Sequence, residues 1–127
     1  MIQSGTYLNV LDNSGARSVC CIKVLPGFQR RYAKIGDRII VSVKKLRTKR
    51  RLFSRVKKGE IYKALIVKMK TLTKFKCGNK INFSENGVVL LNKQNKLIGT
   101  RIFGGLSKSF RYTKYLKFLF LAGGIIL

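Results

Sequence analysis

Residues 7–25 have the sequence YLNVL-DNSG-ARSVCCIKVL and contain two strand patterns separated by a turn signal. Residues 7–11 alternate between polar and apolar side chains, as expected of a strand with one buried face. The next four residues, 12–15, favour a turn because Asp and Asn bond to nearby backbone and Gly accepts positive φ. Residues 18–25 are rich in β-branched side chains and end at Pro26-Gly27. The segment therefore predicts two β-strands with a tight turn between them.

Further strand patterns follow this segment along the chain. Residues 38–43 and 61–69 are apolar and β-branched. Residues 80–83 and 88–92 flank Ser84-Glu85-Asn86-Gly87, and the Asn-Gly pair predicts a β-hairpin. Short strands at about ten-residue spacing are typical of a sandwich or a small barrel. A barrel has the advantage that closure removes the open edges of a small sheet.

The pattern changes after Gly99. Residues 107–111 and 114–118 predict short helical turns that cover one end of the barrel. The apolar tail 115–127 is interrupted by Lys117 and two glycines, and it falls short of the roughly 20 residues that a membrane span needs. It is interpreted as a buried closing strand or helix. With neither a repeat nor a linker, residues 1–127 are expected to form a single mainly β domain.

The charge of the chain is extreme. It has 127 residues with 28 Lys and Arg against four Asp and Glu, which gives a formal net charge of +24. Such a charge repels itself in a compact domain, so a permanent polyanion is the expected partner. Contacts from Lys and Arg to phosphates release counterions, and nucleic-acid binding should depend steeply on salt.

The sequence does not predict an enzyme, a metal site or a cofactor. The chain has no His, which is the commonest general base and imidazole ligand. Its three cysteines lack the spacing of a zinc or redox site and are interpreted as small apolar residues, with the adjacent Cys20 and Cys21 on opposite faces of a strand. The acids are isolated and each adjoins a predicted turn, where a capping role explains it. They are Asp12, Asp37, Glu60 and Glu85.

Basic residues concentrate in the loop 44–58, which contains nine Lys and Arg and no acid. Interspersed Leu and Phe favour an ordered or RNA-induced loop over a solvated, disordered arm. A second cluster, 28–32, joins two predicted strands, and its Phe28 and Tyr32 either stack on bases or plug the barrel end. The residues predicted to contact RNA are Arg17, Arg30, Arg31, Tyr32, Lys44, Lys45, Arg47, Lys49, Arg50, Arg51, Arg55, Lys57 and Lys58.

Over nearly its whole length the chain resembles the universal large-subunit ribosomal protein fourteen family. Each matching sequence motif is weak evidence alone, but the order and spacing of the motifs are specific to the family. The motifs are Tyr7-Leu8-Asn9-Val10, Asp12-Asn13-Ser14-Gly15-Ala16-Arg17, Cys21-Ile22-Lys23-Val24, Arg30-Arg31-Tyr32-Ala33, Ile35-Gly36-Asp37, Val56-Lys57-Lys58-Gly59-Glu60, Lys63-Ala64, Val89-Leu90-Leu91-Asn92 and Ile98-Gly99-Thr100-Arg101-Ile102-Phe103-Gly104.

The resemblance implies a small closed five-stranded β-barrel with a C-terminal extension, 104–127, of short helices. It implies a structural role in the large ribosomal subunit, with large-subunit rRNA bound near the sarcin–ricin region, ribosomal protein nineteen as a neighbour, and an intersubunit bridge to small-subunit rRNA. It also implies docking of a ribosome silencing factor on a surface that contains Thr100, Arg101 and Lys117.

Departures from the family pattern concern the predicted docking surface of the silencing factor and the origin of the chain. The basic loop is longer than usual, Gly105 replaces a proline, and the usual acidic ending is absent. One Pro, no His and no Trp suggest an A+T-rich genome, and the absence of a presequence favours a mitochondrial ribosome, with a plastid or a bacterial cytoplasm as alternatives.

Two other functions remain open from the residues. A free-standing single-stranded RNA-binding barrel would need a row of exposed aromatics on one sheet face. A cationic membrane-surface protein would need its basic residues along one amphipathic helix, and the sequence does not place them so.

Overall fold

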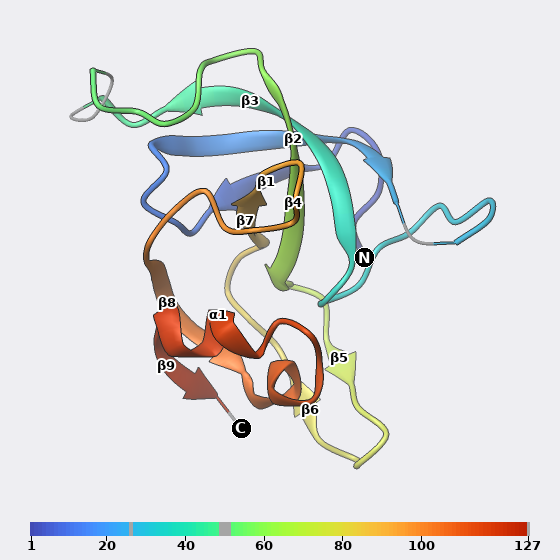
Figure 1. Ribbon diagram of the computed structural model, residues 1–127. Helices are drawn as coiled ribbons and strands as arrows, with labels where there is room; N and C mark the ends of the chain where they lie inside the picture. The colour runs from blue at the N-terminus through green and yellow to red at the C-terminus, as the bar shows by residue number, and fades with distance from the viewer. Residues whose placement is uncertain (26, 49–51, 127) are drawn as a thin grey trace.

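A closed β-barrel forms the centre of the computed structural model, which describes residues 1–25, 27–48 and 52–126 (Figure 1). Neighbouring strands are antiparallel, except that β1 and β7 pair in parallel and close the barrel. The predicted mainly β fold with a closed five-stranded barrel is confirmed. The strands follow the order β1 (Tyr7–Val10), β2 (Ala16–Val24), β3 (Arg38–Leu46), β4 (Ile61–Lys68) and β7 (Gly87–Leu91).

Alternating side chains fill the inside of the barrel. In β1, Leu8 and Val10 are buried while Tyr7 and Asn9 are exposed, as the period of two requires. The same alternation runs through the first part of β3. The strands thereby form one apolar core, whose barrel residues include Leu8, Val10, Val19, Cys21, Ile39, Val41, Val43, Ala64, Ile66, Val88 and Leu90.

Strands β4 and β7 do not alternate, because both of their faces are covered. Residues 64–67 of β4 and all of β7 are buried. A strand that is buried on both faces has a continuous apolar run. The outer face packs against the C-terminal extension, in a second core of Leu11, Leu65, Val67, Val89, Leu91, Ile102, Leu106, Phe110, Tyr115, Phe118 and Leu119.

The C-terminal extension contains the short helices that the sequence predicts. It consists of β8 (Ile102–Ser107), a 3₁₀ helix (Lys108–Tyr112), α1 (Leu116–Leu121) and β9 (Ala122–Ile126). These helices cover the outer wall of β4 and β7, so the prediction that they cover a barrel end is wrong.

The tail is only partly buried, which corrects the expectation for residues 115–127. Helix α1 buries Phe118 and Leu119, but Phe120 is 80% exposed. Strand β9 pairs in parallel with β8 and exposes most of its residues, because nothing in the described chain covers its outer side. No helix among the described residues is both long and apolar enough to span a membrane.

The predicted hairpin between residues 80–83 and 88–92 does not form. Strand β6 (Lys80–Ile81) pairs with β5 (Thr73–Lys74), and β7 pairs with β4 and β1. A type I′ hairpin requires positive φ at both central residues, which neither Asn86 nor Gly87 has. The Asn86 carbonyl instead accepts the Asn9 N–H at 3.0 Å, so the turn signal marks the approach of β7 to β1.

Candidate nucleic-acid interface

The turn 12–15 connects three parts of the chain. The buried carboxylate of Asp12 accepts the N–H of Ser14 at 2.9 Å and the N–H of Leu90 in β7 at 2.8 Å. The side chain of Asn13 accepts the N–H groups of Thr100 and Arg101 at 2.7 and 3.2 Å. Its Nδ2 donates to the Thr100 hydroxyl at 2.8 Å. The capping role predicted for Asp12 is confirmed, and the turn also fixes residues 100–101.

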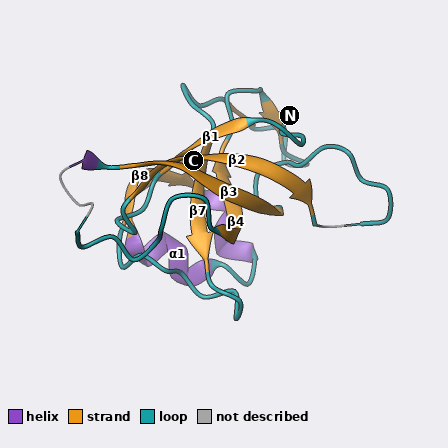
Figure 2. Ribbon diagram, turned by 90° about the horizontal axis from the view of Figure 1, so that it is seen from above, coloured by secondary structure: helices purple, strands orange, loops and turns teal. Residues whose placement is uncertain are grey.

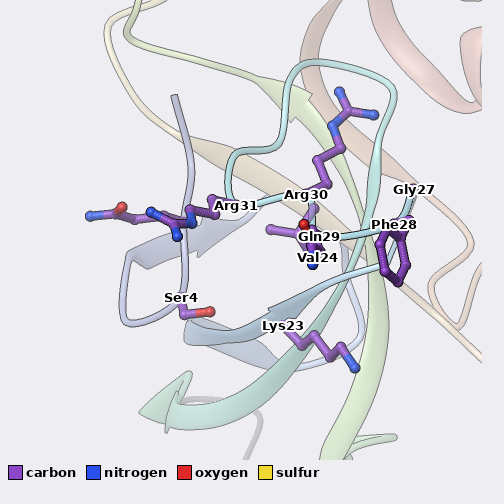
Figure 3. A pocket seen from close by; sticks show the side chains of 9 residues that line it. Ser4, Lys23, Val24, Gly27, Phe28, Gln29, Arg30 and Arg31 are labelled. Carbon is purple, nitrogen blue, oxygen red and sulfur yellow. The ribbon is translucent and has the colours of Figure 1, made fainter.

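A first cavity, which we call the loop cavity, lies between the N-terminal residues, the end of β2 and the loop that follows it (Figure 3). Its volume is about 620 Å³. None of the residues that line it in the described chain is acidic. It is lined by Gln3, Ser4, Lys23, Val24, Gly27, Phe28, Gln29, Arg30 and Arg31.

Arg30 holds the loop in place. Its Nη2 lies 2.8 Å from Oδ2 of Asp37, and its Nε donates to the carbonyl of Tyr32 at 3.1 Å. The same Asp37 oxygen accepts the N–H of Lys34 at 2.7 Å, which confirms its capping role. Both Arg30 and Arg31 are exposed, but only the guanidinium of Arg30 is engaged with other described residues of the protein.

The aromatic residues of this loop face solvent. Phe28 is 93% exposed and Tyr32 is 47% exposed. A plug for the barrel end would be buried, so that alternative is wrong for both residues. Exposed rings beside cations remain available for stacking on a ligand.

A second cavity, which we call the strand-end cavity, lies at the other end of β2 and β3 and has a volume of about 300 Å³. The register pairs Ala16 with Leu46 and Ser18 with Lys45, so the start of β2 adjoins the end of β3. The returning end of the basic loop joins them, because the N–H of Gly59 donates to the Val43 carbonyl at 2.8 Å. Four predicted RNA contacts thereby meet in one place, and the lining is Arg17, Lys44, Lys45, Leu46, Thr48 and Lys58.

Other predicted contacts in the basic loop bond to the protein itself. Arg47 donates to the carbonyl of Val10 at 3.3 Å, and its guanidinium lies over the Phe103 ring. Arg55 donates to the carbonyl of Ile98 at 2.7 Å. Lys57 is exposed and lines neither cavity. The predictions for Lys49, Arg50 and Arg51 lie outside the described residues.

Glu60 closes the turn at the end of the basic loop, as predicted. Its carboxylate accepts the N–H of Lys57 at 3.2 Å and the hydroxyl of Tyr62. The hydroxyl and the backbone N–H lower the pKa of Glu60. Burial, together with the hydrogen bond and charge of Glu60, raises the pKa of Tyr62 to about 12.

Glu85 differs from the predicted turn-capping role, since its carboxylate accepts a hydrogen bond from the Asn9 side-chain amide at 2.9 Å.

The cysteines only partly fit the prediction of small apolar residues. Cys21 is buried and Cys20, on the opposite face, is half-buried. Burial raises the pKa of the Cys21 thiol. Cys77 is exposed, so the prediction is wrong for it. The described residues contain no group of three or more Cys, Asp or Glu side chains arranged to hold a metal.

The three residues predicted for a docking surface do not share a cavity. Thr100 and Arg101 are exposed, and Asn13 fixes their backbone. Lys117 lines a separate cavity of about 420 Å³, with Arg38, Asn95, Lys96, Leu97, Lys114, Tyr115, Phe118 and Leu121.

Several residues at the two basic cavities were not predicted from the sequence. Lys23 follows the apolar residues 19–22 near the end of β2, a pattern that could have placed it on the outer face. Gln3, Ser4 and Thr48 have no such signal, because only the folded chain brings them to a cavity.

The two basic cavities lie at opposite ends of the β2–β3 pair, and their loops extend to opposite sides of the barrel (Figures 1 and 2). From Arg17 to Lys23 the strand rise of about 3.4 Å per residue gives a separation of roughly 20 Å.

A family model described as ribosomal protein L14p/L23e matches residues 1–126. The chain therefore belongs to the ribosomal protein L14p/L23e family, and it is a non-enzymatic structural constituent of the large ribosomal subunit.

Proposed function

We propose that the chain binds large-subunit rRNA through the basic surface that runs along β2 and β3. The observation that supports this is the strand-end cavity, where Arg17, Lys44, Lys45 and Lys58 converge from β2, β3 and the basic loop. None of the described residues that line the cavity is acidic. Four cations that repel one another are stabilised when phosphates lie between them.

The net charge of +24 supports the same partner. Each phosphate that the protein neutralises releases counterions, which lowers the logarithm of the binding constant by about 0.7 to 0.9 per decade of salt. A structural rRNA partner also explains the exposed cations of the loop cavity at the other end of the strands.

The test is the salt dependence of RNA binding by the full chain. Replacing Arg17, Lys44, Lys45 and Lys58 with Ala should reduce the salt slope by about three, since roughly four phosphate contacts are lost. A charge-matched control replaces four exposed lysines of the β5–β6 region, Lys70, Lys74, Lys76 and Lys80. An equal reduction in both variants, or none in the first, would contradict the proposed surface.

We extend the proposal to the subunit interface. Resemblance to the family supports an intersubunit bridge to small-subunit rRNA, ribosomal protein nineteen as a neighbour, and a silencing factor docked near Thr100, Arg101 and Lys117. The exposed side chain of Arg101, on a backbone fixed by Asn13, suits such a contact. Arg101→Glu should reduce subunit joining in gradient sedimentation, whereas Lys74→Glu, a charge reversal of an exposed residue in β5, should leave it unchanged.

The proposed location is a mitochondrial ribosome. The composition supports it, because a chain with one Pro and no Trp or His is typical of an A+T-rich genome. Cell fractionation followed by sedimentation would test it. Recovery of the chain with plastid or cytoplasmic large subunits would assign it to one of the alternatives.

A free-standing single-stranded RNA-binding barrel is not favoured. Such a barrel needs an aromatic row on one sheet face. The exposed aromatics of the described chain are dispersed over separate elements, namely Tyr7, Phe28, Tyr32, Phe53, Tyr112 and Phe120.

A further inference from the structure

We propose that the loop cavity binds a single unpaired nucleotide, with its base stacked on Phe28 and its phosphates beside Lys23 and Arg31. The inference rests on the proposed binding of rRNA and specifies the kind of nucleotide that this cavity takes. Three independent features of the cavity support it.

The first feature is the Phe28 ring. It lines the cavity and is nevertheless 93% exposed. An exposed ring of this size leaves a large apolar area in water, which a ligand with a flat face would cover. Protein aromatics stack on bases that have left the helical stack, whereas bases inside a duplex have no free face. The ring therefore selects an unpaired base.

The second feature is the arrangement of charge. All three cations that line the cavity are exposed, but the guanidinium of Arg30 is engaged by Asp37 and by the Tyr32 carbonyl. Among the described residues, the side chains of Lys23 and Arg31 bond to no other residue, so these two cations are available to a ligand. Figure 3 shows Phe28 and Arg31 on opposite sides of the cavity, with Lys23 extending toward the side of Phe28. A nucleotide with its base on the ring would place its flanking phosphates near these two cations.

The third feature is the fixed shape of the site. The Ser4 hydroxyl donates to the carbonyl of Ile22 at 2.8 Å, and Ile2 and Ala33 exchange backbone hydrogen bonds. These bonds join the N-terminal residues to β2 and to the loop.

Gln29 adds to this picture, because it has a φ of +52°. Positive φ is uncommon for a residue other than glycine. Such conformations persist where the surroundings hold them, and they cluster at ligand sites. The cavity volume of about 620 Å³ lies within the range of small-molecule sites, roughly 300 to 1,000 Å³. The hydrogen bonds of the chain itself thus hold the N-terminal and β2 sides of a cavity of this size.

The experiment compares two RNA hairpins that differ by one bulged 2-aminopurine nucleotide. The full chain should bind the bulged hairpin more tightly and quench the fluorescence of 2-aminopurine. Phe28→Ala should reduce the preference for the bulge by about 5- to 150-fold, the range that loss of one base–aromatic stack predicts. Phe28→Trp should restore both the preference and the quenching.

Three further variants separate stacking from charge and from folding. Phe53→Ala removes a ring that is also highly exposed, at 86%, but that lies in the basic loop, and it should keep the preference. Phe28→Leu keeps an apolar side chain without a π face, so it should lose the quenching while its circular dichroism stays unchanged. Arg31→Ala removes one phosphate contact, so it should weaken binding of the bulged hairpin and lower its salt slope by about 0.7 to 0.9, while the quenching at saturation is kept.

The outcomes distinguish this inference from the function on which it rests. Equal affinity of the unaltered chain for both hairpins, or a preference that survives in Phe28→Ala, would overturn the nucleotide site and leave rRNA binding intact. Failure to bind either hairpin, or intact large-subunit rRNA, at any salt concentration would overturn the proposed function itself.

Discussion

The guanidinium of Arg47 lies over the ring of Phe103, with its central carbon 5.1 Å from the ring centroid. This contact joins the first residue after β3 to β8 of the C-terminal extension. The same side chain donates to the Val10 carbonyl at 3.3 Å. One arginine of the basic loop thus connects the barrel to the extension.

Arg47→Ala should therefore affect folding more than RNA binding. Loss of the cation–π contact and of a hydrogen bond should lower the free energy of unfolding by about 1 to 2 kcal/mol. Lys45→Ala, which removes an exposed charge two residues away, should change it by less than about 0.5 kcal/mol. Urea unfolding gives both values, and a larger loss in the Lys45 variant would contradict the assignment.

Asp12→Ala should be more harmful than an ordinary turn substitution. It leaves the buried N–H of Leu90 and the Ser14 hydroxyl without their acceptor, at a cost of about 1 to 3 kcal/mol. Asp37→Ala, whose partners are more exposed, should cost less. Thermal unfolding of the two variants provides the comparison, and a greater loss in Asp37→Ala would refute this ranking.

Phe110→Ala should open a void between the barrel wall and the extension. Phe110 is 1% exposed in the second core, and Phe→Ala substitutions at such sites cost about 3 to 5 kcal/mol. Phe120→Ala is a matched control, because its ring faces solvent and should contribute little. Similar unfolding midpoints for the two variants in denaturant would show that the extension is not packed as described.

Removing the Asn13 side chain should loosen residues 100–101 without unfolding the barrel. In Asn13→Ala the N–H groups of Thr100 and Arg101 lose their acceptor. Their amide hydrogen exchange should accelerate, while exchange in β3 stays unchanged. Asn9→Ala, an exposed side chain of β1 that bonds to Glu85, is the control and should leave Thr100 and Arg101 protected.

Alkaline pH should weaken the fold through Tyr62. Its pKa is about 12 in the folded chain, against an ordinary value of 10. Between these values the folded state keeps a proton that the unfolded chain releases, so the free energy of unfolding falls as pH rises. Tyr62→Phe should remove this part of the fall. Identical pH profiles of the two proteins in chemical unfolding would exclude the effect.

The sequence predicts the barrel better than it predicts the site, for a physical reason. The strand β1 is predicted from local alternation and β2 from its β-branched residues, and both signals are visible in the chain itself. The hairpin at Asn86-Gly87 fails because β7 finds β4 and β1 as partners, a choice that closure of the barrel imposes.

Charge likewise identifies the type of partner but not each contact. Arg47 and Arg55 are of a residue type that commonly binds phosphate, yet the side chains of both donate to carbonyls of the protein. Arg17, Lys44, Lys45 and Lys58 meet only because the antiparallel register brings the two strand ends together. Which cations remain free depends on such long-range pairing, which no local pattern encodes.

The parallel pairing of β1 with β7 has a consequence for the order of events during synthesis. Asn9 pairs with Gly87, so the barrel is incomplete until most of the chain has been made. Until then one edge of β1 presents unpaired N–H and C=O groups, which can template aggregation. Closure between such distant residues also slows folding. A nascent chain of this protein thus passes through a long stage in which an edge of β1 is unpaired, before its barrel can close.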